Sequence, residues 1–191
     1  MQFAYQFPER CERLVLVSSG GLGRDVHLIL RAAALPGADY VLPVLTDSRV
    51  VGLGRGLGGV LRRIGLAPSG DIDVLARGFS SLDNGASRQA FLHTIRSVID
   101  PGGQRVSAGD RLALAARMPT LIVWGEQDSI IPLTHGEAAH AAMPGSRLER
   151  FPGAGHMPHD ADPQRFARVL LDFCNETDAA TLPADHWRPL L

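Results

Sequence analysis

The chain has 191 residues, of which 45% are hydrophobic and 20% are charged, and its formal net charge at pH 7 is -1. This composition is typical of one globular domain, or one domain with an inserted lobe, that buries a sizeable core. Because the charge is nearly balanced and no run of like charges occurs, we expect no nucleic acid and no membrane among its partners.

The sequence shows neither a targeting signal nor a membrane anchor. Its apolar stretches are shorter than the ~20 residues that a membrane-spanning helix needs. Residues 1–10 lack the basic start, the apolar run and the small-residue cleavage site of a signal peptide. Cys11 and Cys174 lie far apart in apolar contexts, which favours buried, reduced thiols over a disulfide. The sequence therefore predicts a cytoplasmic protein.

A short helix and a buried strand are predicted at the start of the chain. Apolar side chains among residues 1–7 fall on overlapping helical turns, and Pro8 ends the run. This helix has no capping residue and barely two turns, so we expect it to be part of something longer. Residues 14–17, Leu-Val-Leu-Val, predict a buried strand that ends in Ser-Ser-Gly-Gly at 18–21.

Residues 24–118 have the pattern of a helical lobe without a convincing strand. Glycine and proline separate five expected helices, at residues 26–35, 48–64, 72–82, 87–99 and 110–116. Ser87 is the predicted N-cap of the fourth helix, whose apolar side chains share one face. The glycines among residues 52–59 disfavour a helix within the second segment.

The strand–helix pattern then resumes. Four elements are predicted: a buried strand at residues 121–124, a weaker strand at residues 147–151, and helices at residues 134–142 and 163–173. The last strand is partly polar, as suits the edge of a sheet. The last helix is expected to start at Asp162-Pro163. The tail from Asn175 is expected to be a loosely held coil.

These elements predict the α/β fold class, with strand–helix units of a parallel sheet at both ends and a helical insertion between them. The expected domains are a core of residues 1–23 and 119–175, an inserted lobe of residues 24–118 and a tail of residues 176–191. Right-handed crossovers place the carboxyl ends of parallel strands along one edge of the sheet. Ser18, Asp128 and His156 should therefore come to the same side.

Asp128 and His156 are the candidate catalytic residues. Asp128 follows a buried strand, where open α/β sheets place their chemistry, although it could instead satisfy the backbone of its turn. A histidine, whose pKa is ordinarily about 6.5, can take a proton from a hydroxyl and return it to a leaving group. A carboxylate bonded to its other ring nitrogen would fix the tautomer. A lone histidine in a loop is more often structural, so the pairing with Asp128 carries the hypothesis.

Three sequence motifs, taken in their order along the chain, resemble those of a known protein family. The chain runs from PERCERLVLVSSGGLG through the helical insertion to PTLIVWGEQDSIIP and then to PGAGHMPHDADPQRF. This order closely resembles the C-terminal half of the α/β-hydrolase fold, over residues 1–174. The resemblance implies that Asp128 is the acid and His156 the base of a Ser-His-Asp triad. It also implies that residues 24–118 form a cap over the substrate pocket.

The sequence departs from the family at the nucleophile. The family carries its serine in a Gly-x-Ser-x-Gly elbow, and nothing in this sequence matches that motif. By resemblance the serine would lie roughly half a dozen residues before Met1, and the oxyanion-hole donors would be missing as well. Ser18 and Ser19 end a different strand and are not favoured as replacements.

Other patterns in the sequence are weaker. Residues 54–59 fit Gly-x-Gly-x-x-Gly, but no strand precedes them, so a flexible lobe segment is favoured over a dinucleotide site. His135 and His140 are five positions apart on a predicted helix and do not share a face, unlike the histidines of a zinc protease.

Two other roles for histidines are weighed and not favoured. His156 with His159 and Asp160 could in principle bind a metal, but no third ligand position is evident, so neither a metal nor a cofactor is expected. His93 could line a substrate pocket, although a satisfied core or interface histidine is favoured.

Three hypotheses about function remain open. In the first, the parent protein is a serine hydrolase of an ester, a related acyl bond or the C–C bond of a diketone, acting on a small hydrophobic substrate. In the second, the chain is a catalytically inactive fragment or interaction module that pairs with another chain or a copy of itself through the open edge of strand 14–17. In the third, the start codon is misassigned or the gene is truncated. Dehalogenases, epoxide hydrolases and cofactor-free oxygenases share the fold, so the fold does not identify the substrate.

Overall fold

The computed structural model describes residues 1–47, 49–50, 52, 70–82, 84–109, 111–112 and 117–185. The chain divides into two compact units, one of Met1–Gly23 with Ser107–Leu191 and one of Arg24–Val106, here called the sheet unit and the helical unit. Most of the helix predicted at 48–64, the glycine pattern at 54–59, nearly all of the helix at 110–116 and the last six residues lie outside the described residues.

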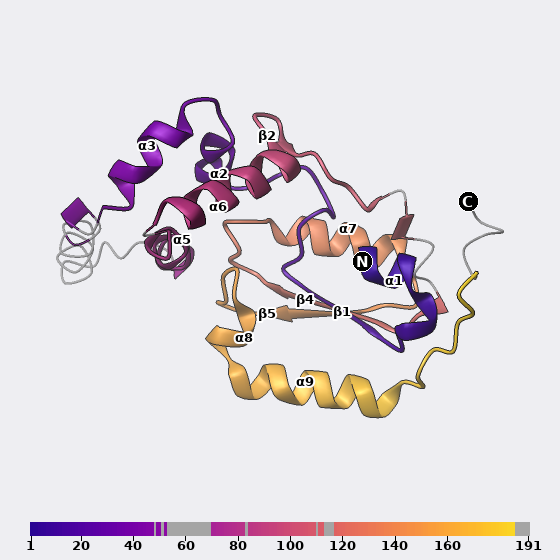
Figure 1. Cartoon of the computed structure of the whole chain (residues 1–191). Coiled ribbons are helices and arrows are strands. Elements are labelled where there is room, and N and C mark those ends of the chain that lie inside the picture. Colours follow the sequence, from indigo (N-terminus) through magenta and orange to yellow (C-terminus); the bar gives the residue numbers. More distant parts are fainter. Residues whose placement is uncertain are drawn as a thin grey trace. The chain divides into compact units, whose positions relative to one another are not determined.

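Three parallel strands form the centre of the sheet unit. They are β1 (Leu14–Val17), β4 (Thr120–Gly125) and β5 (Arg147–Phe151), in the order β1-β4-β5 (Figure 1). Leu16 pairs with Ile122, and Ile122 pairs with Leu148. Every residue of β4 is buried, because it lies between two strands and under helices on both faces. The predicted parallel sheet is confirmed, with β5 at an edge.

Helices cover both faces of this sheet. The sheet unit contains α1 (Gln2–Gln6), the 3-10 helix η1 (Pro8–Arg10), α7 (Leu133–Ala142), α8 (Pro158–Ala161) and α9 (Pro163–Glu176). Figure 1 shows α7 and α9 on opposite faces. Leu121 and Val123 pack with Phe173 of α9, whereas the Trp124 ring lies against Gly136 of α7. Alternate residues of β4 therefore supply the two layers of the core.

The start of α9 is as predicted. The Asp162 carboxylate accepts a hydrogen bond from the Arg165 N–H at 2.9 Å, and Pro163 occupies the first turn. An acceptor at the N-cap and a proline that needs no partner for its nitrogen are both favourable at this position.

The tail after α9 differs from the expected loose coil. The Ala180 N–H donates to the Glu12 carbonyl at 2.9 Å, and the Arg13 Nε donates to the Thr177 hydroxyl at 2.9 Å. Leu182 is buried in a cluster with Ala4 and Met118. The prediction was wrong for residues 177–182, because their anchors come from the other end of the chain.

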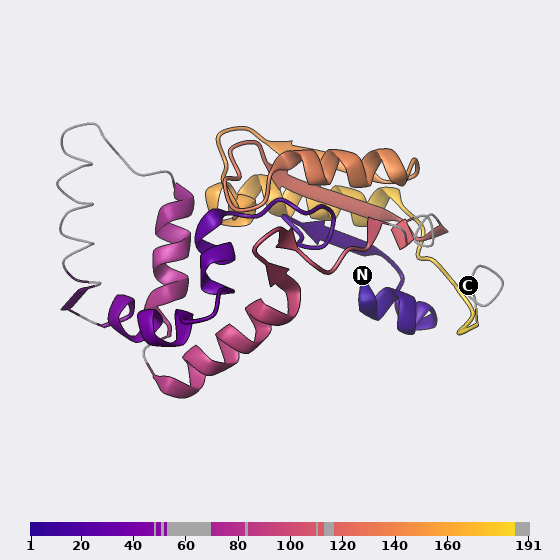
Figure 2. The same ribbon diagram turned by 90° about the horizontal axis from the view of Figure 1, so that it is seen from above.

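The described part of the helical unit includes four helices and a small hairpin. The helices are α2 (Leu28–Ala33), α3 (Ala38–Leu45), α5 (Gly70–Ser80) and α6 (Gly85–Val98), and the hairpin is the antiparallel pair β2 (Ile99–Asp100) and β3 (Gly103–Gln104). Figure 2 shows the hairpin directly after α6. Leu42, Leu82 and Leu92 are buried in the core of this unit. Arg96 of α6 bonds the carboxylate of Asp39 on α3, which lowers the pKa of Asp39.

Three details of this unit differ from the predictions. Helix α3 was missed because it contains Pro43, which cannot donate a helical hydrogen bond and indicates a break in sequence. The N-cap of α6 is Asn84, whose side chain accepts from the Ser87 N–H at 2.9 Å, and not Ser87 itself. The hairpin was missed because strands of two residues carry no alternation signal. Its Gly103 has φ +120°, and a Cβ there would meet the Arg24 carbonyl oxygen at 2.1 Å.

The cysteines are both free, as expected, but only one of them is even partly buried. Cys11 is half-buried, and Cys174 is exposed on α9, so the expectation of a buried thiol was wrong for Cys174.

Over the ranges that the structure describes, no helix is both long enough and apolar enough to cross a membrane.

Candidate active site

Asp128 lies in the turn that follows β4. The turn is held against the segment after β5: the Glu126 N–H donates to the Phe151 carbonyl at 3.1 Å, and the Gln127 N–H donates to the Ala154 carbonyl at 2.9 Å. Asp128 Oδ1 accepts from the backbone N–H groups of Ile130 at 2.9 Å and Ile131 at 2.8 Å. One carboxylate oxygen therefore serves the turn, as the structural alternative for this residue predicted.

The other oxygen of Asp128 faces His156. The distance between His156 Nδ1 and Asp128 Oδ2 is 3.0 Å, and the Asp128 side chain is fully buried while that of His156 is 19% exposed. Because a carboxylate only accepts, this contact assigns the proton of a neutral imidazole to Nδ1 and leaves Nε2 as the basic nitrogen. The structure thus brings together the two residues that the sequence proposed as acid and base.

A backbone contact beside the pair depends on Gly125. A Cβ at Gly125 would lie 2.0 Å from the Gly155 carbonyl oxygen and 2.4 Å from that of Ala154. Only glycine allows the end of β4 to approach the loop before His156 so closely. Sequence reasoning missed this role, although a glycine directly after a buried strand is the signal that could have indicated it.

Ser18 follows the carboxyl end of β1, and its N–H donates to the Val123 carbonyl at 3.0 Å. Its φ is +41°, which is uncommon for a residue with a Cβ and costs about 1–2 kcal/mol. The Ser18 side chain is buried, and its hydroxyl has no hydrogen-bond partner among the residues that the structure describes. Since β1, β4 and β5 are parallel neighbours, Ser18, Asp128 and His156 all follow strand ends on one edge of the sheet.

Four other histidines that the sequence analysis considered do not take part in this pair. His93 is exposed on α6, so the core role considered for it does not hold. His135 is buried beside Gly23, while the His140 Nδ1 lies 2.8 Å from the Ser146 hydroxyl. His159 is partly exposed, and its Nε2 is 3.9 Å from Oδ1 of the exposed Asp160. In the described part of the chain, no group of three or more His, Cys, Asp or Glu side chains could hold a metal ion.

A comparison with families of known proteins agrees with this arrangement. Residues 8–169 match the sequence model described as "Alpha/beta hydrolase family". The chain belongs to the α/β-hydrolase family.

Curated relatives extend the comparison beyond the family. Over 193 aligned residues the chain is 38% identical to the uncharacterized protein Rv2715 of Mycobacterium tuberculosis (strain ATCC 25618 / H37Rv), with 100% of the chain and 57% of the relative covered. It is 28% identical over 178 residues to the 2-hydroxy-6-oxo-6-phenylhexa-2,4-dienoate hydrolase of Delftia acidovorans, with 91% of the chain and 57% of that protein covered. The chain therefore spans little more than half the length of these relatives.

Solved structures show the same fold. A mutant of CumD, a meta-cleavage product hydrolase from Pseudomonas fluorescens IP01, complexed with acetates, superposes with a TM-score of 0.59. The sequences are 22% identical, and the match covers 92% of this chain and 60% of CumD.

Proposed function

We propose that the chain carries the acid and the base of a Ser-His-Asp hydrolase that cleaves an ester, a related acyl bond or a C–C bond. His156 takes the proton of a serine hydroxyl through Nε2 as the serine attacks a carbonyl, and then gives that proton to the leaving group. Asp128 holds the Nδ1–H tautomer and stabilises the imidazolium that forms in between. The single observation that carries this proposal is the 3.0 Å contact between His156 Nδ1 and the buried Asp128 Oδ2.

The nucleophile of this mechanism comes from outside these 191 residues. No Gly-x-Ser-x-Gly elbow occurs in the sequence, and the curated relatives are longer than this chain. A serine in such an elbow, together with the backbone N–H donors of an oxyanion hole, would complete the site. In that complete protein, residues 24–118 serve as the cap over the substrate.

A small hydrophobic substrate with an acyl carbonyl is the proposed class. The name of the relative from Delftia acidovorans specifies a 2-hydroxy-6-oxo-6-phenyl-dienoate, so C–C bond hydrolysis of such compounds is the first candidate. Simple esters are the second candidate, because the same triad chemistry cleaves them.

The test begins with the DNA upstream of Met1, read in frame for Gly-x-Ser-x-Gly. The 191-residue chain and the longer product are then assayed with p-nitrophenyl esters and with a 6-phenyl-6-oxo-dienoate. We expect negligible turnover by the chain alone. We expect turnover by the longer product that falls by about 10³-fold or more in His156→Ala, because the base is lost.

His159→Ala is the matched control, since this partly exposed histidine lies three positions further along the chain and its Nε2 faces Asp160 at 3.9 Å. It should change turnover by less than about twofold, as surface substitutions usually do. Turnover by the longer product that His156→Ala leaves unchanged would overturn the proposal. Robust activity of the chain alone that His156→Ala abolishes would place the nucleophile within these residues.

The edge position of β1 favours a second candidate function. In the order β1-β4-β5, β1 has one neighbour among the described strands, and its residues are apolar. An apolar edge strand invites another strand to pair with it. In this alternative the chain is a catalytically inactive module that pairs along β1 with a second copy of itself.

A further inference from the structure

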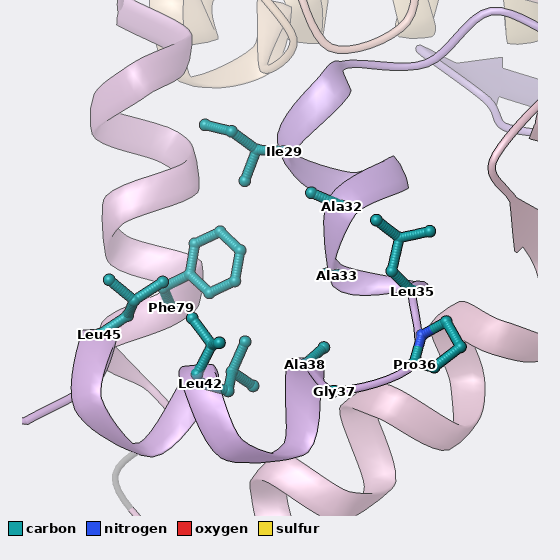
Figure 3. Close-up of a pocket in the computed structure, with 11 residues that line it drawn as sticks. Ile29, Ala32, Ala33, Leu35, Pro36, Gly37, Ala38, Leu42, Leu45 and Phe79 are labelled. Atoms are coloured by element: carbon teal, nitrogen blue, oxygen red, sulfur yellow. The ribbon is translucent and has the colours of Figure 1, made fainter.

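The helical unit contains an apolar pocket between α2, α3 and α5. Its volume is about 460 Å³, and all eleven lining residues are aliphatic, aromatic, proline or glycine. Figure 3 shows the side chains of Ile29, Leu42 and Phe79 around the space that these helices enclose. Every residue that lines the pocket belongs to the helical unit, whereas Asp128 and His156 belong to the sheet unit.

The turn between α2 and α3 gives the pocket its shape. Helix α2 ends at Ala33, Pro36 lies in the turn that follows, and Gly37 reverses the chain with φ +91°, a conformation that favours glycine. The two helices diverge from this turn, and Phe79 projects from α5 toward the space between them (Figure 3). Phe79 is held in place by an edge-on contact with Phe91 of α6, with ring centroids 5.8 Å apart. The walls therefore belong to a packed structure.

The floor and the rim of the pocket differ in exposure. Ala38 and Leu42 are buried beneath it and belong to the core of the unit. At the rim, Leu35 is 42% exposed, Val41 54% and Leu45 53%. Large aliphatic side chains at the mouth of a hollow leave apolar surface in water, which a ligand of matching chemistry would remove from water.

We propose that this pocket binds an uncharged hydrocarbon group, one per chain. No lining side chain has a nitrogen or oxygen that could bond a ligand, so a charged or strongly polar group would lose its hydration without compensation. The volume is that of a small-molecule site, whereas a protein partner would need a far more extended surface. This inference stands on the helical unit alone and holds whether or not the proposed hydrolase activity does.

The probe for the test is N-phenyl-1-naphthylamine, an uncharged fluorophore that brightens in apolar sites. Titrated into the 191-residue chain, it should bind saturably with a stoichiometry of one, and 1-decanol should displace it. Decanoate should displace it more weakly at neutral pH, because the carboxylate resists leaving water.

Val41→Asp and Val44→Asp form a matched pair of variants. Both valines are exposed on α3, at 54% and 61%, but only Val41 lines the pocket. We expect Val41→Asp to weaken probe binding by about tenfold or more and Val44→Asp by less than about twofold, because a carboxylate at the pocket must be desolvated by the ligand. Ala32→Phe should also block the pocket, because Ala32 lines it. Ala32 is exposed, so the larger side chain does not have to fit into the core of the unit. The control is Ala90→Phe, which adds the same side chain at an exposed position of α6.

Three outcomes would overturn the proposal. The first is no saturable binding by the wild-type chain. The second is an equal loss of binding in Val41→Asp and Val44→Asp, which would indicate that the probe adsorbs non-specifically to the exposed apolar surface of α3 and does not occupy the pocket. The third is a concentration-dependent dimer, seen by sedimentation velocity, that both substitutions disrupt and the probe does not affect. That result would assign the face to a second copy of the chain.

Discussion

Asp128 combines two roles that sequence reasoning had treated as alternatives. Its Oδ1 accepts two backbone N–H groups of its own turn, and its Oδ2 faces His156 Nδ1. A carboxylate has enough lone pairs for both tasks, so a residue that shapes a turn can also orient a histidine. The turn bonds hold the carboxylate in place, and this fixes the orientation of His156.

The two roles can be separated by substitution at Asp128. Asp128→Ala leaves two buried N–H groups without an acceptor and should lower the free energy of unfolding by about 3 kcal/mol. Asp128→Asn keeps an oxygen for those N–H groups and should lower the free energy of unfolding by only about 1 kcal/mol. Its amide N–H would face His156 Nδ1, so the neutral imidazole would carry its proton on Nε2 and lose its basic nitrogen there. Urea denaturation measures both values.

Asp160→Ala is the control for this comparison, because Asp160 is exposed and its ion pair with His159 is 3.9 Å long. It should change the free energy of unfolding by less than about 0.5 kcal/mol. Equal destabilisation by Asp128→Ala and Asp128→Asn would contradict a stabilising role for the two turn hydrogen bonds that is distinct from the contact with His156.

At the scale of elements, the contact between the end of β4 and the loop after β5 depends on the absence of a side chain at Gly125. In Gly125→Ala the Cβ would lie 2.0 Å from a backbone carbonyl oxygen, which cannot rotate away. We expect a loss of about 2–3 kcal/mol in the free energy of unfolding, since overpacking forces the backbone to shift. The loop before His156 should move with it, and amide NMR shifts of residues 153–156 would report that movement.

Gly78→Ala is the matched control, because the same substitution at this position should raise the free energy of unfolding. Gly78 lies inside α5, where an added Cβ meets nothing within 4 Å. Alanine is the better helix former, so stability should rise by roughly 0.5–1 kcal/mol. Destabilisation by Gly78→Ala, or a neutral Gly125→Ala, would contradict this account of the two glycines.

At the scale of the whole molecule, we expect the open edge of β1 to determine whether the chain stays monomeric. The N–H groups of Leu14 and Ser18 bond toward β4, so by alternation the N–H groups of Val15 and Val17 face the outer edge. We expect the chain to self-associate through this edge. Val15→Pro should shift it to monomer, because proline removes one outward donor without breaking the ladder to β4.

Sedimentation velocity over a range of concentrations tests this expectation. Val15→Thr is the control, because threonine keeps the N–H and suits a strand, so it should associate as the wild type does. A wild-type chain that stays a monodisperse monomer and melts cooperatively would rule out the edge-pairing alternative.

The sequence by itself determined the three strands, the helices α1, α7 and α9 around them, and the two candidate site residues. Continuous apolar runs bounded by turn residues indicate buried strands, and residues just after parallel strands come to one edge whatever the details of packing. Only the tertiary structure decided how Asp128 divides its oxygens, why Gly125 must be glycine, how Leu182 is anchored and that α3 helps to form a pocket. Each of these depends on contacts between residues distant in the chain, or on packing that overrides a local signal such as Pro43, and local patterns carry no record of such contacts.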